Sequence, residues 1–228
     1  MNNKIIKPDS VEGKYVVLGD MENSRKSNDK GGLRLKVISS LKYINSKFKQ
    51  DIYIPFEIYK GIDEIGGVVN SPQNLYNIFE YLNNEIYPAR VRIVAINALF
   101  DLYDKSNKTS HLDGVAFHLA AAAMAGLKKR KKYFEIDSGD YNRKYSDDLA
   151  INQIIDLIQV IKNRMTRRQW EIGLLIRKNI NTINQVSIAK KLNISQQAVS
   201  DALNSSNYYE VLNAEISVNT LLGKLKKG

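Results

Sequence analysis

Hydrophobic positions in the first 140 residues fall into two kinds of pattern, which alternate along the chain. Short apolar runs rich in β-branched residues predict strands at 14–18, 51–59, 65–69, 91–98 and 133–136. Apolar residues spaced by three or four predict helices at 33–48, 72–82 and 115–127. The resulting order, β-α-β-β-α-β-α-β, is typical of an α+β fold of the ferredoxin-like or palm type with one extra helix and strand. We therefore expect a first domain over residues 1–140.

Beyond the hydrophilic segment 137–148, the pattern changes to helical spacing alone. Helices are predicted at 149–162 and 167–177, in two short segments between 185 and 203, and at 208–225. The hydrophilic segment is the best candidate for a linker. The second domain is expected to be all-α and to span residues 149–228.

The two short segments have the pattern of a helix-turn-helix. Ile188, Ala189 and Leu192 form the apolar stripe of the first helix, and 193–195 interrupts it. Ser195 is placed to cap the second helix by accepting a backbone N–H bond. On that second helix the side chains expected to turn inward are Ala198, Val199, Ala202 and Leu203. An ordinary hairpin of two amphipathic helices is the alternative.

Polar residues occupy the side of the second helix that this pattern leaves open, namely Gln196, Gln197, Ser200, Asp201 and Asn204. Glutamine and asparagine can form paired hydrogen bonds with adenine in the major groove, and serine can bond to bases or phosphates. Gln196, Gln197, Ser200 and Asn204 are therefore candidate base contacts. The cations that flank the motif, Arg167, Arg168, Lys190 and Lys191, are candidate phosphate contacts.

Composition favours a polyanionic partner. The 228 residues carry a formal net charge of +10, and attraction to phosphate would make binding steeply salt-dependent. The absence of cysteine excludes disulfides and thiolate metal sites. No apolar run approaches a membrane span, and residues 1–7 lack the apolar core of a signal peptide. We expect a cytoplasmic protein with DNA as partner and no membrane contact.

A segment just before the two short helices strengthens the DNA interpretation. The sequence Met165-Thr-Arg-Arg-Gln-Trp-Glu-Ile-Gly-Leu-Leu175, followed by the helix-turn-helix pattern, resembles the DNA-binding part of LuxR-type regulators and region 4 of bacterial sigma factors. The resemblance implies that Thr166 caps a helix and that Trp170 is a core or docking residue.

Most of the chain resembles the SatD family, a bacterial group of poorly defined function. The matching pieces are Gly19-Asp20 with Ser24-Arg25, Gly61-Ile-Asp-Glu-Ile65 with Gly67, Arg92-Ile-Val-Ala-Ile96, and Leu112-Asp-Gly-Val-Ala-Phe-His118. Their order and spacing support the resemblance, and the SatD-type pattern extends into a C-terminal helix-turn-helix.

The same pieces resemble the palm domains of nucleotidyl cyclases and GGDEF proteins. That resemblance implies two magnesium ions held by Asp20 and Asp63, with Glu64 beside them, because carboxylates supply the oxygen ligands that magnesium prefers. Arg25 could contact phosphate, and His118 is a weak candidate for catalysis. However, Ile62 stands where the palm families place glycine, and a bulky strand, 93–98, replaces a glycine-spaced one. This bulk would crowd a triphosphate.

Three hypotheses follow. The first is a DNA-binding transcriptional regulator whose N-terminal domain senses a nucleotide, another small ligand or a partner. The alternative is a magnesium-dependent nucleotide-binding or cyclase-like enzyme, and the third is an interaction adaptor with an incidental basic surface. A homodimer is expected because one recognition helix makes few contacts and the last helix is rich in apolar residues, with packing on its own domain as the alternative explanation. Those apolar residues are Tyr209, Leu212, Ile216, Leu221, Leu222 and Leu225.

Overall fold

The computed structural model describes residues 9–22, 29–61, 63–102, 109, 112–139, 147–178 and 184–225. The chain forms two compact units. The first comprises Met1–Asn152 together with Asn219–Gly228, and the second comprises Gln153–Val218. The predicted linker, 137–148, falls largely on residues outside the described ranges. The predicted α+β class is confirmed, with a mixed sheet in the N-terminal half and helices throughout.

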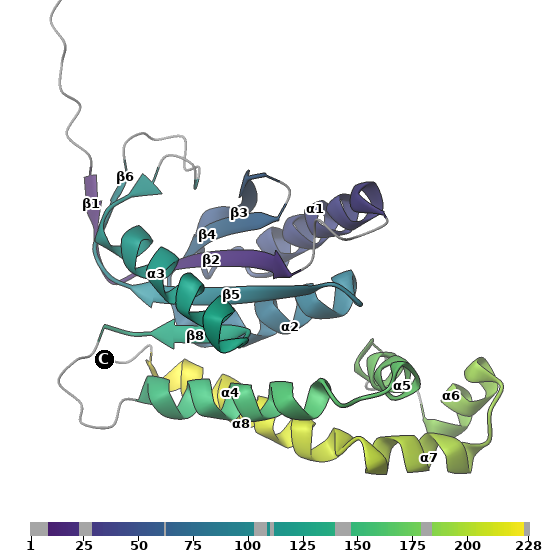
Figure 1. Ribbon diagram of the computed structural model, residues 1–228. Coiled ribbons are helices and arrows are strands. Elements are labelled where there is room, and N and C mark those ends of the chain that lie inside the picture. The colour runs from purple at the N-terminus through teal and green to yellow at the C-terminus, as the bar shows by residue number, and fades with distance from the viewer. Residues whose placement is uncertain are drawn as a thin grey trace, which may run out of the picture. The chain divides into compact units, whose positions relative to one another are not determined.

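A five-stranded sheet of order β3-β4-β2-β5-β8 is the centre of the first unit (Figure 1). Its strands are β2 (Tyr15–Glu22), β3 (Ile52–Lys60), β4 (Glu64–Val69), β5 (Arg90–Asn97) and β8 (Phe134–Asp137). The central strand, β2, pairs antiparallel with β4 on one side and with β5 on the other. At the edge, β8 runs parallel to β5. All five strands were predicted within a few residues of their observed bounds.

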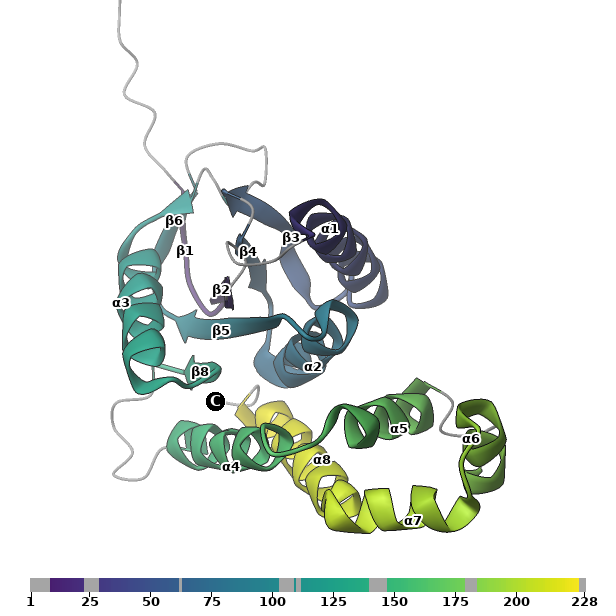
Figure 2. The same ribbon diagram turned by 45° about the vertical axis from the view of Figure 1, so that its right-hand side comes forward.

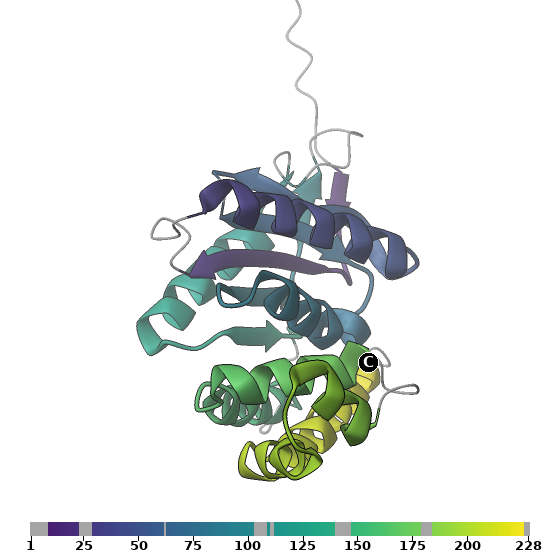
Figure 3. The same ribbon diagram turned by 90° about the vertical axis from the view of Figure 1, so that its right-hand side faces the viewer.

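Helices cover both faces of this sheet. α1 (Lys30–Lys47) and α2 (Leu75–Ile86) lie on one face, and α3 (Val115–Arg130) lies on the other (Figures 2 and 3). A short 3₁₀ turn, Pro72–Asn74, precedes α2, so the predicted proline at the first turn starts this 3₁₀ segment. Under α3, alternate strand residues such as Val16, Leu18 and Val94 pack against its alanine-rich face in one buried cluster.

A second, smaller sheet was missed by the hydrophobic pattern. It has the order β1-β6-β7, with β1 (Asp9–Val11), β6 (Phe100–Leu102) and β7 (Leu112–Asp113) paired antiparallel. Segments of two or three residues are too short to show a period of two, because that signal needs about four residues or more.

The outer edge of β8 is closed by a side chain of α4 (Asp147–Lys162). The Asn152 amide accepts from the Ile136 N–H and donates to the Ile136 carbonyl, both at 3.0 Å. At the same end, the Asp148 carboxylate accepts from the Ser138 N–H at 2.8 Å. These bonds occupy backbone groups that an edge strand would otherwise expose.

The second unit is built from the helices that follow. They are α5 (Arg167–Lys178), α6 (Gln185–Leu192), α7 (Gln196–Ser205) and α8 (Tyr208–Lys224). The buried core they share consists of Ile172, Ile188, Ala189, Val199, Leu203 and Tyr208. The expectation that Ala198 turns inward was wrong, since it is exposed. Val199, Ala202 and Leu203 already form the i, i+3, i+4 stripe, and Ala198 lies about 100° away from it around the helix.

In the described part of the chain, no helix is both long enough and apolar enough to cross a membrane.

Candidate functional site

The turn between α6 and α7 is fixed by backbone geometry and by two caps. Asn193 adopts the left-handed conformation, with φ 52° and ψ 51°, and ends α6. The Ile194 N–H then donates to the Ala189 carbonyl at 3.0 Å. α7 begins where the Ser195 hydroxyl accepts from the Ala198 N–H at 3.1 Å. The predicted cap is confirmed, and the two helices are held in one defined relation.

The open side of α7 presents the polar residues that the sequence placed there. Gln196, Gln197 and Asn204 are exposed, and Ser200 is partly buried. The Gln197 amide donates to the Asp201 carboxylate at 2.8 Å, one turn further along the helix. This bond uses one N–H of Gln197 and leaves its carbonyl oxygen and second N–H available.

The four flanking cations lie on two neighbouring helices. Arg167 and Arg168 are exposed in the first turn of α5, and Arg168 pairs with Glu171 at 3.0 Å. Lys190 and Lys191 are exposed in the last turn of α6, where cations also interact favourably with the helix dipole.

α5 is attached to α7 through its own N-terminus. The Thr166 hydroxyl accepts from the Gln169 N–H at 3.3 Å, and the Gln169 side chain accepts from the Thr166 N–H at 2.8 Å. This reciprocal pair is a capping box, as the Thr-x-x-Gln spacing implies. Gln169 also donates to the Ser205 hydroxyl of α7 at 3.0 Å. Trp170 is partly buried, and Lys162 Nζ lies 6.0 Å from the centroid of its ring.

A buried ion network links three helices of the same unit. Lys162 of α4 lies 2.6 Å from one carboxylate oxygen of Glu215 on α8, and Arg177 of α5 lies 2.7 Å from the other. Sequence reasoning missed this network. A signal was available, because Glu215 falls in the buried stripe of α8 that also contains Val211, Val218 and Leu222.

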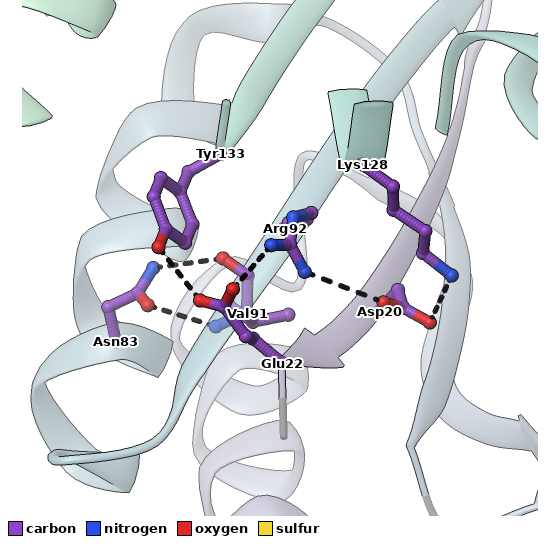
Figure 4. Close-up of polar contacts among 7 residues, drawn as sticks. All are labelled: Asp20, Glu22, Asn83, Val91, Arg92, Lys128 and Tyr133. Atoms are coloured by element: carbon purple, nitrogen blue, oxygen red, sulfur yellow. Dashed lines mark hydrogen bonds and ion pairs between the residues drawn. The ribbon is translucent and has the colours of Figure 1, made fainter. Parts of the chain in front are cut away.

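In the first unit, charged residues of β2 and β5 form a cluster beside the end of α3 (Figure 4). Asp20 and Arg92 are register partners, with 3.9 Å between Arg92 Nη1 and the carboxylate. Lys128 of α3 donates to Asp20 at 2.7 Å. Arg92 Nη2 donates to Glu22 at 2.6 Å, and the Tyr133 hydroxyl donates to the other Glu22 oxygen at 2.7 Å. We call these five residues the sheet cluster.

The sheet cluster is supported from both sides. The Asn83 amide of α2 accepts from the Val91 N–H at 3.0 Å and so fixes the start of β5 (Figure 4). The Arg90 guanidinium lies over the Tyr133 ring, 3.7 Å from its centroid. The position of Tyr133, and with it the Glu22 carboxylate, is therefore set by several contacts at once.

Electrostatics keep Glu22 ionised. Burial alone would raise the pKa of Glu22, but hydrogen bonds from Tyr133 and Arg92 and the charges of Arg92 and Arg90 lower the pKa below its usual value. On the neighbouring strands, burial raises the pKa of Tyr59 to about 12, and the nearby carboxylates of Glu64 and Asp20 act in the same direction.

The predicted magnesium site does not emerge from these contacts. Asp20 lies inside β2, not after its end as expected, and its register partner on β4 is Glu64. Asp63 precedes β4, and its backbone carbonyl accepts from the Met21 N–H at 3.0 Å. Asp20 is held by Lys128 and Arg92, and the described residues include no group of three histidine, aspartate or glutamate side chains that could hold a metal ion. These residues therefore do not fit a magnesium ion.

The two remaining candidates differ in what the structure describes. His118 is exposed near the start of α3. Arg25 and Ile62 lie outside the described residues.

Comparison with protein families gives one match, in which the model of the SatD family covers residues 15–222. A search of curated proteins finds no match.

Proposed function

The chain belongs to the SatD family, and we propose that it is a DNA-binding transcriptional regulator whose C-terminal helices bind DNA. The observation that supports this proposal most is the pair α6 and α7. Its turn, its caps and its buried Ala189 match a helix-turn-helix, with α7 as the recognition helix. The polar residues on the open side of α7 would then face the major groove.

The distribution of side chains supports the same assignment. Gln196, Gln197 and Asn204 are long or flexible amides on an exposed helix face, the type of side chain that reads adenine. The exposed cations at the starts and ends of α5 and α6 suit contacts with the phosphate backbone. A net charge of +10 favours approach to any polyanion.

For the N-terminal unit we propose a palm-like domain that senses a small ligand or a partner. The antiparallel pairing of β2 with β4 and β5, with α1 and α2 on one face, supports the palm-like description. Ion pairs occupy Asp20, the acid that a palm-type enzyme would give to metal, which favours sensing over catalysis. A DNA partner implies that the protein works in the cytoplasm.

We further propose that the regulator is a homodimer. α8 buries Val211, Val218 and Leu222 but leaves Ile216 57% exposed, and Leu157 of α4 is 65% exposed. Apolar side chains on two helices of one unit suit a symmetric contact between copies. Two recognition helices would then read two half-sites.

Selection from random-sequence duplexes by the full chain tests the proposed function. At moderate salt we expect enrichment of a short sequence repeated with two-fold symmetry. Recovery of random sequences after several rounds would contradict sequence-specific DNA binding.

A further inference from the structure

A cavity of about 400 Å³ lies at the end of the main sheet, where β2 ends and β5 begins. Its walls come from these two strand ends, the first two turns of α1, and the end of α2 with the turn after it. This volume is at the small end of the range for ligand-binding pockets. It suits a small metabolite better than a nucleotide or a peptide.

Charges of both signs line the cavity, and they are arranged in pairs. On the strand side, Glu22 of β2 and Arg90 of β5 are register partners. On the helix side, Asp29 caps α1 and Lys36 lies two turns further along it. Each side therefore supplies one acid and one base, and the four charges cancel.

Three of these four charged groups are held in place by other contacts. Glu22 accepts from Arg92 and Tyr133. Arg90 lies over the Tyr133 ring, and Asp29 accepts from the Gly32 N–H at 2.7 Å. A site whose charges are already positioned loses less conformational entropy when a ligand binds.

The charge pattern restricts the ligand. A nucleotide would bring several negative charges toward Glu22 and Asp29, and a metal ion would meet Lys36 and Arg90. A molecule with one positive and one negative group would satisfy both pairs. Leu33 and Ile86, which also line the cavity, offer apolar surface to the rest of such a molecule.

We propose that this cavity binds an α-amino acid with an apolar side chain. Its ammonium group lies toward Glu22 and Asp29, its carboxylate toward Lys36 and Arg90, and its side chain against Leu33 and Ile86. The inference deepens the proposed function, because it identifies the class of ligand that the N-terminal unit senses. The binding itself does not depend on whether the C-terminal helices bind DNA.

Isothermal titration calorimetry of the full chain with each of the twenty amino acids tests this inference. We expect binding of one or more of leucine, isoleucine, valine, methionine and phenylalanine. We also expect that the N-acetyl and the amide derivatives of the amino acid that binds, each lacking one charge, bind at least about tenfold more weakly. No binding of any amino acid up to about 10 mM, well beyond the usual range for specific sites, would overturn the inference. Equal binding of either derivative would also overturn it.

Matched variants locate the binding. Lys36→Gln removes one cavity cation, and Asp29→Asn removes one acid but keeps a residue that can cap α1. Each is expected to weaken binding by about tenfold or more, because each removes a charge-assisted contact. Lys42→Gln, on an exposed part of α1 that does not line the cavity, should leave binding unchanged. Affinities unaffected by Lys36→Gln and Asp29→Asn would overturn the assignment to this cavity.

The same preparations, assayed on DNA without any amino acid, report on the proposed function separately. A protein that binds an amino acid but shows no preferred DNA sequence would refute DNA recognition and leave the cavity assignment standing. The reverse result would refute the cavity assignment alone.

Discussion

Lys162 and Glu215 form an ion pair of 2.6 Å between Nζ and a carboxylate oxygen, although their side chains are only 4% and 6% exposed. Arg177 occupies the other oxygen of the same carboxylate at 2.7 Å. The pair joins α4 to α8, and Arg177 adds α5. Within the second unit, the helix that follows α7 is thus connected to the helix that precedes α6.

Removing Glu215 should strongly destabilise the second unit. Glu215→Leu leaves Lys162 buried without its carboxylate, and breaking one side of a buried pair typically costs about 3–5 kcal/mol. The free energy of unfolding of the full chain, measured by urea titration, should fall by an amount in this range. Glu210→Leu, at an exposed position in the first turn of α8, should change it by at most about 1 kcal/mol. Equal losses for the two variants would contradict a special role for the buried pair.

The Ser195 cap should contribute measurably to the stability of α7. Ser195→Ala removes the acceptor for the Ala198 N–H, and loss of such a cap costs about 1 kcal/mol. Ser195→Asn should retain most of the wild-type stability, because asparagine also caps helices well. The control is Ser217→Ala, on an exposed part of α8, which is expected to change stability by less than about 0.5 kcal/mol. Thermal unfolding monitored by circular dichroism measures all three, and a neutral Ser195→Ala would show that the cap contributes nothing.

Acid should weaken the first unit through Glu22. The folded state lowers the pKa of this carboxyl below its ordinary value of 4.5, so its contribution to stability is fully present above pH 4.5. That contribution is lost as the pH falls through the lower folded-state pKa. Wild type should therefore be more stable than Glu22→Gln at neutral pH, and the difference should shrink in acid. Urea titrations across the acidic range measure this, and a constant difference would rule out the linkage.

The proposed dimer should depend on exposed apolar residues of the second unit. Ile216→Glu places a charge in the proposed interface, so light scattering should show a dimer for wild type and a monomer for this variant. Lys42→Glu, on α1 in the other unit, should remain dimeric. A monomeric wild-type protein at micromolar concentration would contradict the dimer.

Local patterns predicted most of the fold. The strands of the main sheet, the helices and the Ser195 cap all rest on residues close in sequence, where periodicity and capping rules apply. The contacts that define the sheet cluster are of a different kind. Lys128 and Asp20 are separated by 108 positions, and nothing in either neighbourhood indicates the other.

The cavity also escaped prediction, for a similar reason. Its lining residues come from two strand ends, α1 and the end of α2, and only the register of β2 against β5 brings Glu22 beside Arg90. Asp20 illustrates the opposite error. The glycine before it suggested the end of a strand, but β2 continues to Glu22 because Gly19 packs against Ile65 of β4.

The proposal of sequence-specific DNA binding is tested most directly by comparing two variants on two duplexes, one obtained by selection and one with the same bases scrambled. Gln197→Ala should weaken binding to the selected duplex by about 1–3 kcal/mol and leave the scrambled duplex unchanged. Lys191→Ala should weaken both equally and reduce the salt dependence, because a phosphate contact carries no sequence information. Equal effects of Gln197→Ala on the two duplexes would contradict base recognition by α7.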